Sequence, residues 1–119
     1  MLPKKFRLQD YQEIERVKKK GKLYQTPLFG FLVLKKENQP FSRFFFTRFT
    51  FIISKKISKK ATERNKTKRL LSEATRELLL KIKPGFDAVF LAKKSLIGRN
   101  YIEVKKETES LFKKCGLLS

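Results

Sequence analysis

The chain has 119 residues, enough for one domain that buries a core without disulfide or metal staples. Hydrophobic residues make up 40% of the chain, which excludes a disordered basic tail. Thirty Lys and Arg residues against eleven Asp and Glu residues give a formal net charge of +19. Because such a charge repels itself, it predicts a polyanionic partner, with nucleic acid first and an anionic membrane surface second.

The sequence offers little for catalysis by the protein itself. It contains no histidine, the commonest general base and metal ligand. Its acidic residues form no close Asp pair and no Glu-x-x-His motif of the kind that a two-metal nuclease needs. Asp87 and Glu63 are interpreted as relieving like-charge repulsion, so we assign no metal site and no cofactor to the protein. We expect any chemistry to belong to a partner.

Three features predict a soluble, cytoplasmic protein with no membrane partner. Cys115 is the only cysteine, so no internal disulfide forms, as is typical of a reducing compartment. Residues 1–8 lack the apolar core of a signal peptide. The most apolar stretch, residues 44–53, is interrupted by Arg48 and is far shorter than the roughly 20 residues of a membrane span.

The first third of the chain predicts a basic arm, a helix and a strand. Residues 1–7 form the arm. Leu8, Tyr11, Ile14 and Val17 then recur at a spacing of three, which predicts a helix that Gly21 ends. Residues 28–34 are almost wholly apolar and predict a strand, and the polar residues 36–40 predict a loop.

The middle of the chain predicts a second strand and a long helix. Residues 44–53 are aromatic and β-branched, and their alternation places Phe49 and Phe51 on one face and Arg48 on the other. An additional short strand is expected between Glu37 and Ser54. After a basic turn at residues 55–60, the long helix runs until Pro84. Its apolar face is predicted to contain Thr67, Leu70, Leu71, Ala74, Leu78 and Ile82, and its hydrophilic face Asn65, Lys68, Arg69, Ser72 and Arg76.

The last third predicts a buried strand and a closing helix. Residues 86–92 are apolar without alternation. Asn100 and Glu103 resemble a capping box, and Gly116 is placed to end the helix. We therefore predict an α/β fold of the α+β sandwich kind. A small mixed sheet is packed with helices in the order α-β-β(-β)-α-β-α, within one domain over residues 1–119.

Residues 55–69 are the most informative stretch. Eight of these fifteen residues are Lys or Arg, and only Glu63 is acidic. A charge run is often just the solvated face of a surface helix, but such helices usually mix signs and this one does not. The basic loop can follow a phosphate backbone, while the helix holds Asn65 and Arg69, four residues apart, on one side.

This stretch also resembles the signature of a known family. The run Arg64-Asn65-Lys66-Thr67-Lys68-Arg69, preceded by Ile53-Ser54-Lys55-Lys56, looks like that of the ribonuclease P protein subunit. Pro84-Gly85-Phe86-Asp87 and Leu111-Phe112-Lys113-Lys114 fit the family's frame further along the chain. Thr67, Ser72 and Thr50 depart from the usual residues, as do Ile14 and Lys18, which stand where the family often has aromatic residues.

The resemblance implies a fold, an activity and partners. The family has a left-handed βαβ crossover, against the usual right-handed rule. Its RNA subunit holds the active site and magnesium ions, and the protein assists endonucleolytic removal of the 5′ leader from precursor tRNA. The implied partners are the catalytic RNA and precursor tRNA, with no DNA. The implied RNA-binding residues are Lys55, Lys56, Lys59, Lys60, Arg64, Asn65, Lys66, Lys68 and Arg69.

The resemblance also implies a cleft for the leader between the sheet and the first helix, lined by Ile14, Lys18, Phe31 and Phe29. Because Phe29 and Phe31 are two residues apart in a strand, both face this cleft or neither does, and two Phe in an apolar strand are usually core.

Three alternatives compete with this interpretation. The first is a non-catalytic RNA-binding protein of another ribonucleoprotein, such as the ribosome. The second is a membrane-surface protein, which the strand-like runs of Phe disfavour. The third is a protein-only nuclease, which the lack of histidine and of clustered carboxylates disfavours.

Overall fold

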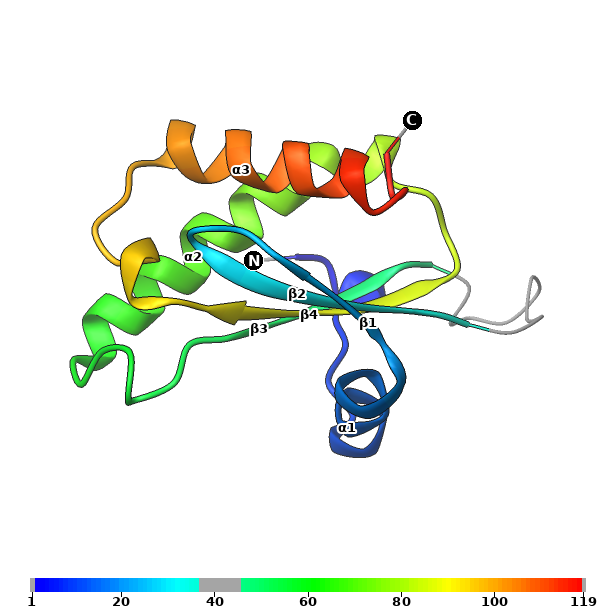
Figure 1. Ribbon diagram of the computed structural model, residues 1–119, viewed down its shortest axis with the longest axis horizontal. Coiled ribbons are helices and arrows are strands. Elements are labelled where there is room, and N and C mark those ends of the chain that lie inside the picture. Colours follow the sequence, from blue (N-terminus) through cyan, green and yellow to red (C-terminus); the bar gives the residue numbers. More distant parts are fainter. Residues whose placement is uncertain (1, 37–45, 119) are drawn as a thin grey trace.

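The computed structural model of the chain describes residues 2–36 and 46–118. Its elements are α1 (Tyr11–Lys20), β1 (Lys22–Gln25), β2 (Phe29–Lys35), β3 (Arg48–Ile52), α2 (Ala61–Leu78), β4 (Phe86–Ala92) and α3 (Tyr101–Lys114). Short 3-10 turns occupy Lys4–Phe6, Leu79–Lys81 and Lys94–Leu96. The strands form one sheet in the order β1-β2-β4-β3. Helices α2 and α3 cover one face of this sheet, while α1 alone lies against the other (Figure 1).

The sheet is mixed, as predicted. β2 is antiparallel to both β1 and β4, whereas β3 and β4 are parallel neighbours joined through α2. The parallel pair requires a crossover, and α2 supplies it. The α+β class and the order of elements are therefore confirmed, and the left-handed sense of the crossover stays a prediction.

The extra strand expected between Glu37 and Ser54 falls mostly on residues 37–45, which lie outside the described part, and residues 46–54 contain only β3. The fourth strand of the sheet lies elsewhere in the chain. It is β1, which directly follows α1 and pairs with β2 from Lys22↔Val33 to Gln25↔Gly30. Its residues are mostly exposed and polar because it is an edge strand, so pairing with β2 rather than its own composition fixes its conformation. The predicted strand at residues 44–53 is β3, which begins only at Arg48; residues 44 and 45 lie outside the described part.

Helix α1 begins and ends at residues whose chemistry explains the boundary. The carboxylate of Asp10 accepts hydrogen bonds from the backbone N–H groups of Gln12 and Glu13. At Gly21 a Cβ atom would lie 2.5 Å from the carbonyl oxygen of Val17, so only glycine fits there. The predicted end of the helix is confirmed, whereas Leu8 precedes the helix and is buried beside β3.

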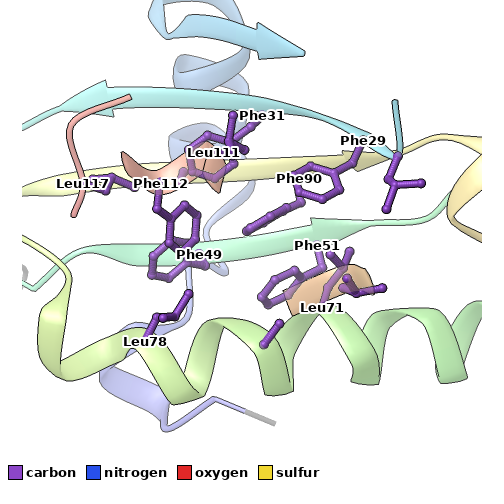
Figure 2. Close-up of a cluster of buried hydrophobic side chains, with 14 of the residues drawn as sticks. Phe29, Phe31, Phe49, Phe51, Leu71, Leu78, Phe90, Leu111, Phe112 and Leu117 are labelled. Carbon is purple, nitrogen blue, oxygen red and sulfur yellow. The ribbon is translucent and has the colours of Figure 1, made fainter. Parts of the chain in front are cut away.

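The main core lies between the sheet and the pair α2 and α3. Alternate residues of β2, β4 and β3 meet the two helices there (Figure 2). The ring centroids of Phe31 and Phe90 are 4.8 Å apart, and those of Phe29 and Phe90 are 5.1 Å apart. This layer buries the side chains of Phe29, Phe31, Phe49, Phe51, Phe90, Phe112, Leu71, Leu78 and Leu111. Phe49 and Phe51 share one face of β3, as predicted, and that face lies in the main core.

The predicted faces of α2 are confirmed in part: the helix ends at Leu78, so Ile82 lies beyond it, and Leu70 is only half-buried. Thr67, Leu71, Ala74 and Leu78 are buried. Ser72, expected on the hydrophilic face, is 2% exposed, because the N-terminal segment lies against that flank of the helix. Its hydroxyl donates a hydrogen bond to the carbonyl oxygen of Lys68 at 2.8 Å, which satisfies the buried polar group.

Helix α3 begins at the predicted cap. The side-chain oxygen of Asn100 accepts a hydrogen bond from the N–H of Glu103 at 2.9 Å. The carboxylate of Glu103 pairs with Arg99. Gly116 follows the helix with a φ of +85°, a conformation that favours glycine.

Candidate RNA-binding surfaces

The basic turn at residues 55–60 is fixed to the first turns of α2. Ser58 is buried, and its hydroxyl is hydrogen-bonded to the carboxylate of Glu63. The guanidinium of Arg64 donates to the carbonyl oxygen of Ser58 at 2.9 Å, and Ile57 packs against the main core. The turn is therefore anchored by uncharged and internally paired groups, and its lysines are all exposed: Lys55, Lys56, Lys59 and Lys60.

The exposed side of α2 continues this basic surface. Asn65 and Arg69 are exposed and lie four residues apart on one side of the helix, as predicted. Lys68 is exposed on the flank that faces the N-terminal segment, while Lys66 projects roughly 100° away from Asn65. Arg64 differs from the others, because it is half-buried and its bond to Ser58 shapes the turn. We call the exposed residues of the turn together with Asn65, Lys68 and Arg69 the basic surface.

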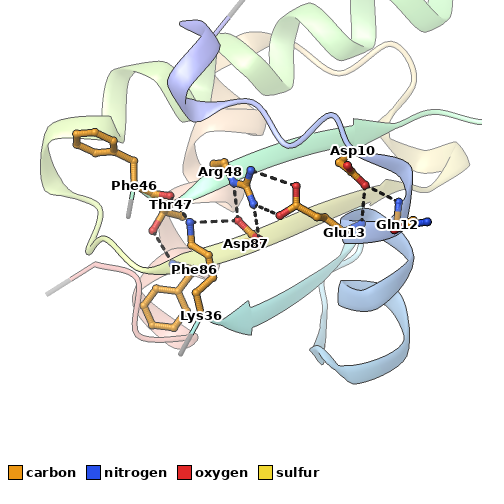
Figure 3. Close-up of polar contacts among 9 residues, drawn as sticks. All are labelled: Asp10, Gln12, Glu13, Lys36, Phe46, Thr47, Arg48, Phe86 and Asp87. Carbon is orange, nitrogen blue, oxygen red and sulfur yellow. Dashed lines mark hydrogen bonds and ion pairs between the residues drawn. The ribbon is translucent and has the colours of Figure 1, made fainter. Parts of the chain in front are cut away.

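On the opposite face of the sheet, α1 is pinned by a buried arginine. Arg48 on β3 is 5% exposed and donates two hydrogen bonds to the carboxylate of Asp87 on β4, at 2.9 and 3.0 Å. The same guanidinium donates to Glu13 of α1 (Figure 3). Burial acts to lower the pKa of Arg48, but its bonds to Asp87 and Glu13 outweigh burial and raise it.

Lys36 joins this group at the end of β2. Its ammonium lies 3.5 Å from the Asp87 carboxylate and donates to the carbonyl oxygen of Phe46 at 2.8 Å (Figure 3). Burial lowers the pKa of Lys36, against the opposing attraction of Asp87. The Asp87 carboxylate therefore forms ion pairs with two cations of the protein itself, Lys36 and Arg48. The Glu63 carboxylate is hydrogen-bonded to the hydroxyl of Ser58. Within residues 2–36 and 46–118, no three acidic or cysteine side chains lie close enough together to hold a metal ion.

The sequence pattern shows Arg48 only as an interruption of an apolar stretch and does not predict its ion pairs with Asp87 and Glu13. Its partner Asp87 lies 39 positions away and is brought opposite by the parallel register Arg48↔Asp87. A charged residue in the middle of an aromatic strand was the available signal, since such a residue needs a buried counter-ion.

Helix α1 covers its sheet face unevenly. Val17 and Ile14 of the helix, with Leu8 just before it, pack over the buried Leu32 and Val89, whereas Leu91 and Ile52 are only half-buried. Beyond the helix, at the end of the sheet opposite Arg48, the register aligns Gln25, Gly30, Leu91 and Ile52 across the strands. Leu23 of β1, which is 49% exposed, lies beside Gly30. We call these five residues the open sheet face.

Of the four residues predicted to line the leader cleft, the structure places two in the main core and two on α1. Phe29 and Phe31 have no exposed surface and point into the main core, so their assignment to this cleft was wrong. The reason is the alternation of β2, which places the intervening Gly30 on the side of α1. Ile14 is half-buried against this face, and Lys18 is exposed with its ammonium 3.4 Å from Glu15.

Comparisons with known proteins agree with this geometry. The family described as Ribonuclease P matches residues 2–116 of the chain. This chain belongs to the ribonuclease P protein family. The ribonuclease P protein component of Synechocystis sp. (strain PCC 6803) is 36% identical over 117 residues, covering 98% of this chain and 90% of that protein. That of Bacillus cereus (strain B4264) is 35% identical over 116 residues, covering 98% and 96%.

Solved structures show the same fold. The ribonuclease P protein from Thermotoga maritima superposes with a TM-score of 0.77 at 28% identity, over 91% of this chain and 96% of that one. The Staphylococcus aureus protein gives a TM-score of 0.82 at 19% identity, over 96% and 98%.

Membership of the ribonuclease P family places the chain in tRNA processing. It is the protein component of a ribonucleoprotein endoribonuclease, with RNA as its partner. The ribosomal alternative is not favoured, because the relatives and the structural neighbours are ribonuclease P proteins. In the part of the chain that the structure describes, no helix is both long and apolar enough to cross a membrane.

Proposed function

We propose that this chain binds the catalytic RNA of ribonuclease P through its basic surface and holds the 5′ leader of precursor tRNA on its open sheet face. The observation that carries the proposal is the anchored turn, which presents four exposed lysines next to Asn65 and Arg69. Because the turn is fixed by Ser58, Glu63 and Arg64, its lysines are ordered before RNA arrives, which reduces the entropy that binding costs.

The two surfaces have different chemistry and suit different parts of RNA. The basic surface offers point charges from Lys and a planar donor from Arg69, which suit a folded RNA backbone. The open sheet face is apolar at Leu23, Leu91 and Ile52, which suits unpaired bases. β3 ends at Ile52 and the basic turn follows directly, so the two surfaces adjoin.

The division of labour follows from these surfaces. The protein neutralises phosphates where the two RNAs meet and keeps the leader extended, and we place the catalytic centre and its magnesium ions in the RNA. Ile14 and Lys18 border the leader, with Leu91 and Ile52 in place of Phe29 and Phe31. We further propose that residues 1–119 act as one RNA-binding domain in the cytoplasm, with residues 1–7 as a basic arm.

The test is cleavage of precursor tRNA at low magnesium by a bacterial ribonuclease P RNA, with and without this protein. We expect the protein to restore correct 5′ cleavage and to be inert without the RNA. Cleavage by the protein alone, or binding of RNA without any stimulation, would contradict the proposal.

A matched pair of variants assigns the effect to the basic surface. The double variant Lys59→Ala, Lys60→Ala removes two charges from the turn, and Lys106→Ala, Lys114→Ala removes two exposed charges from α3. We expect only the first to weaken stimulation. Equal losses would show that net charge, rather than this surface, drives binding.

A further inference from the structure

Tyr11 is the most exposed aromatic side chain of the described residues. It is 73% exposed at the first position of α1. Within residues 2–36 and 46–118 its ring contacts no other aromatic ring, and its hydroxyl has no hydrogen bond. The helical spacing predicts an inward-facing Tyr11, but of that stripe Leu8, Ile14 and Val17 pack against the sheet and Tyr11 does not. An aromatic ring left in solvent at such a position is a candidate contact for a ligand.

The geometry of α1 fixes the direction in which Tyr11 projects. Glu13 reaches Arg48, at the end of the sheet where β3 begins. Tyr11 lies roughly 160° around the helix from Glu13, and Lys18 roughly 140°. Both therefore project on the flank of α1 that faces the open sheet face.

The ends of α1 place these two side chains over different strands. Just before the helix, the N–H of Leu8 donates to the carbonyl oxygen of Phe49 on β3. After the helix, Gly21 lies against the carbonyl of Val33 on β2. Tyr11 is therefore near β3 and Lys18 near β2, along one edge of the open sheet face.

Cations lie on both sides of Tyr11 along the chain, Arg7 before α1 and Lys18 within it. A hollow at the edge of β3 is lined by Arg7, Gln9, Thr50 and Lys68, so it brings the segment just before α1 next to Lys68 of the basic surface. Lys18 lies seven residues further along α1. The carboxylate of Glu15 pairs with Lys18, and Arg7 and Lys68 supply the excess positive charge beside the start of α1. A ring flanked by cations suits a nucleobase whose neighbouring phosphates need counter-charges.

We propose that Tyr11 is the stacking platform for an unpaired base of the RNA strand that crosses the open sheet face. The inference rests on the proposed function, because it takes the leader as that strand. Since Ile14 and Lys18 supply no ring, Tyr11 is the aromatic group that α1 offers there. Its phenol ring lies against the base, while Lys18 contacts a neighbouring phosphate.

The test compares two substrates of the reconstituted ribonucleoprotein, a precursor tRNA with a leader of several nucleotides and one trimmed to a single nucleotide. We expect Tyr11→Ala to weaken binding of the long-leader substrate roughly tenfold and to leave the short-leader substrate unchanged. Tyr11→Phe keeps the ring and should retain wild-type affinity. Ile102→Ala, which removes another exposed apolar side chain from α3, is the control and should change neither substrate.

The outcomes separate this inference from the proposed function. If the wild-type protein stimulates cleavage and discriminates between the two leaders but Tyr11→Ala behaves like wild type, the stacking inference is wrong and the function stands. The inference is also overturned if Tyr11→Ala weakens both substrates equally. If the wild-type protein gives no leader discrimination at all, the leader-binding proposal itself fails.

A fluorescence measurement reports stacking directly. The sequence has no tryptophan, so Tyr11→Trp introduces a single indole. We expect its fluorescence to be quenched when the long leader binds, and the quenching to vanish when one leader base is replaced by an abasic site. Quenching that persists at every abasic position, or none with the intact leader, would contradict the proposal.

Discussion

At the scale of single residues, Arg48 joins three elements that are far apart in the chain. Its guanidinium is shared between Asp87 of β4 and Glu13 of α1, so it ties the position of α1 to the parallel pair of strands. The group is buried, and a buried charge is tolerated only when its partners are complete. The position of α1 on the sheet therefore depends on Arg48, a residue buried beneath it.

We predict that Arg48→Met destabilises the fold by about 3–5 kcal/mol, because Asp87 keeps its buried charge and loses its main partner. The measurement is urea unfolding followed by circular dichroism. The control is Arg76→Met, which removes an arginine paired with Glu73 at the surface and should change stability little. If both variants lost the same free energy of unfolding, the ion pairs of Arg48 would contribute no more to stability than those of a surface arginine.

Arg69 is the residue whose loss separates binding from folding. It is exposed on α2, and within residues 2–36 and 46–118 its guanidinium makes no hydrogen bond or ion pair. We predict that Arg69→Ala weakens binding to the catalytic RNA roughly tenfold, the loss of one charge-assisted hydrogen bond, while the melting temperature is unchanged. A lower melting temperature would assign Arg69 a structural role instead.

At the scale of elements, the turn after β3 and the start of α2 form one unit. Ser58 holds it together without contributing charge, whereas Lys59 beside it contributes charge without holding it. The N-terminal segment plays a comparable part at the other side of β3. The N–H of Leu8 and a parallel bridge from Arg7 to Phe49 cover the edge that β3 would otherwise expose.

We predict that Ser58→Ala and Lys59→Ala weaken RNA binding for different reasons. Ser58→Ala loses a buried hydrogen bond that orders the turn, so affinity should fall about fivefold with the salt dependence unchanged. Lys59→Ala removes a phosphate contact, so the slope of log affinity against log salt should fall by about one. Binding isotherms over a salt series distinguish the two, and a changed slope in Ser58→Ala would refute the structural role given to Ser58.

At the scale of the whole molecule, the net charge is +19, and most of the carboxylates form ion pairs within the protein. Glu13 and Asp87 both pair with Arg48. At the surface, Glu73 pairs with Arg76 and Glu77 pairs with Lys105. The lysines of the basic turn have no carboxylate of this kind opposite them in the described residues. The excess positive charge is therefore available to the RNA partner.

We predict a steep salt dependence for the complex with the catalytic RNA. If about six phosphates are engaged, affinity should fall ~10³-fold or more between low and moderate salt, because the released counter-ions are re-bound at high concentration. The measurement is the dissociation constant over a series of salt concentrations at fixed magnesium. A flat response would rule out phosphate neutralisation as the source of affinity.

Features that depend on local order along the chain could be predicted without the structure. The helical stripe of α2, the cap at Asn100, the stop at Gly21 and the buried strand Phe86–Ala92 are all set by neighbours within a few positions. The basic surface is of the same kind, since residues 55–69 are continuous in sequence and their family signature is local. Such features follow from periodicity and composition, which a sequence displays directly.

The tertiary structure alone decided which face each strand residue occupies and what lies opposite it. The orientation of Phe29 and Phe31, the pairing of Arg48 with Asp87, the burial of Ser72 and the existence of β1 all depend on distant segments. A strand's alternation defines two faces, but only packing decides which of them is covered by which helix. The open sheet face and the projection of Tyr11 beside it therefore emerge only when α1 is laid across the sheet, since no local pattern encodes that arrangement.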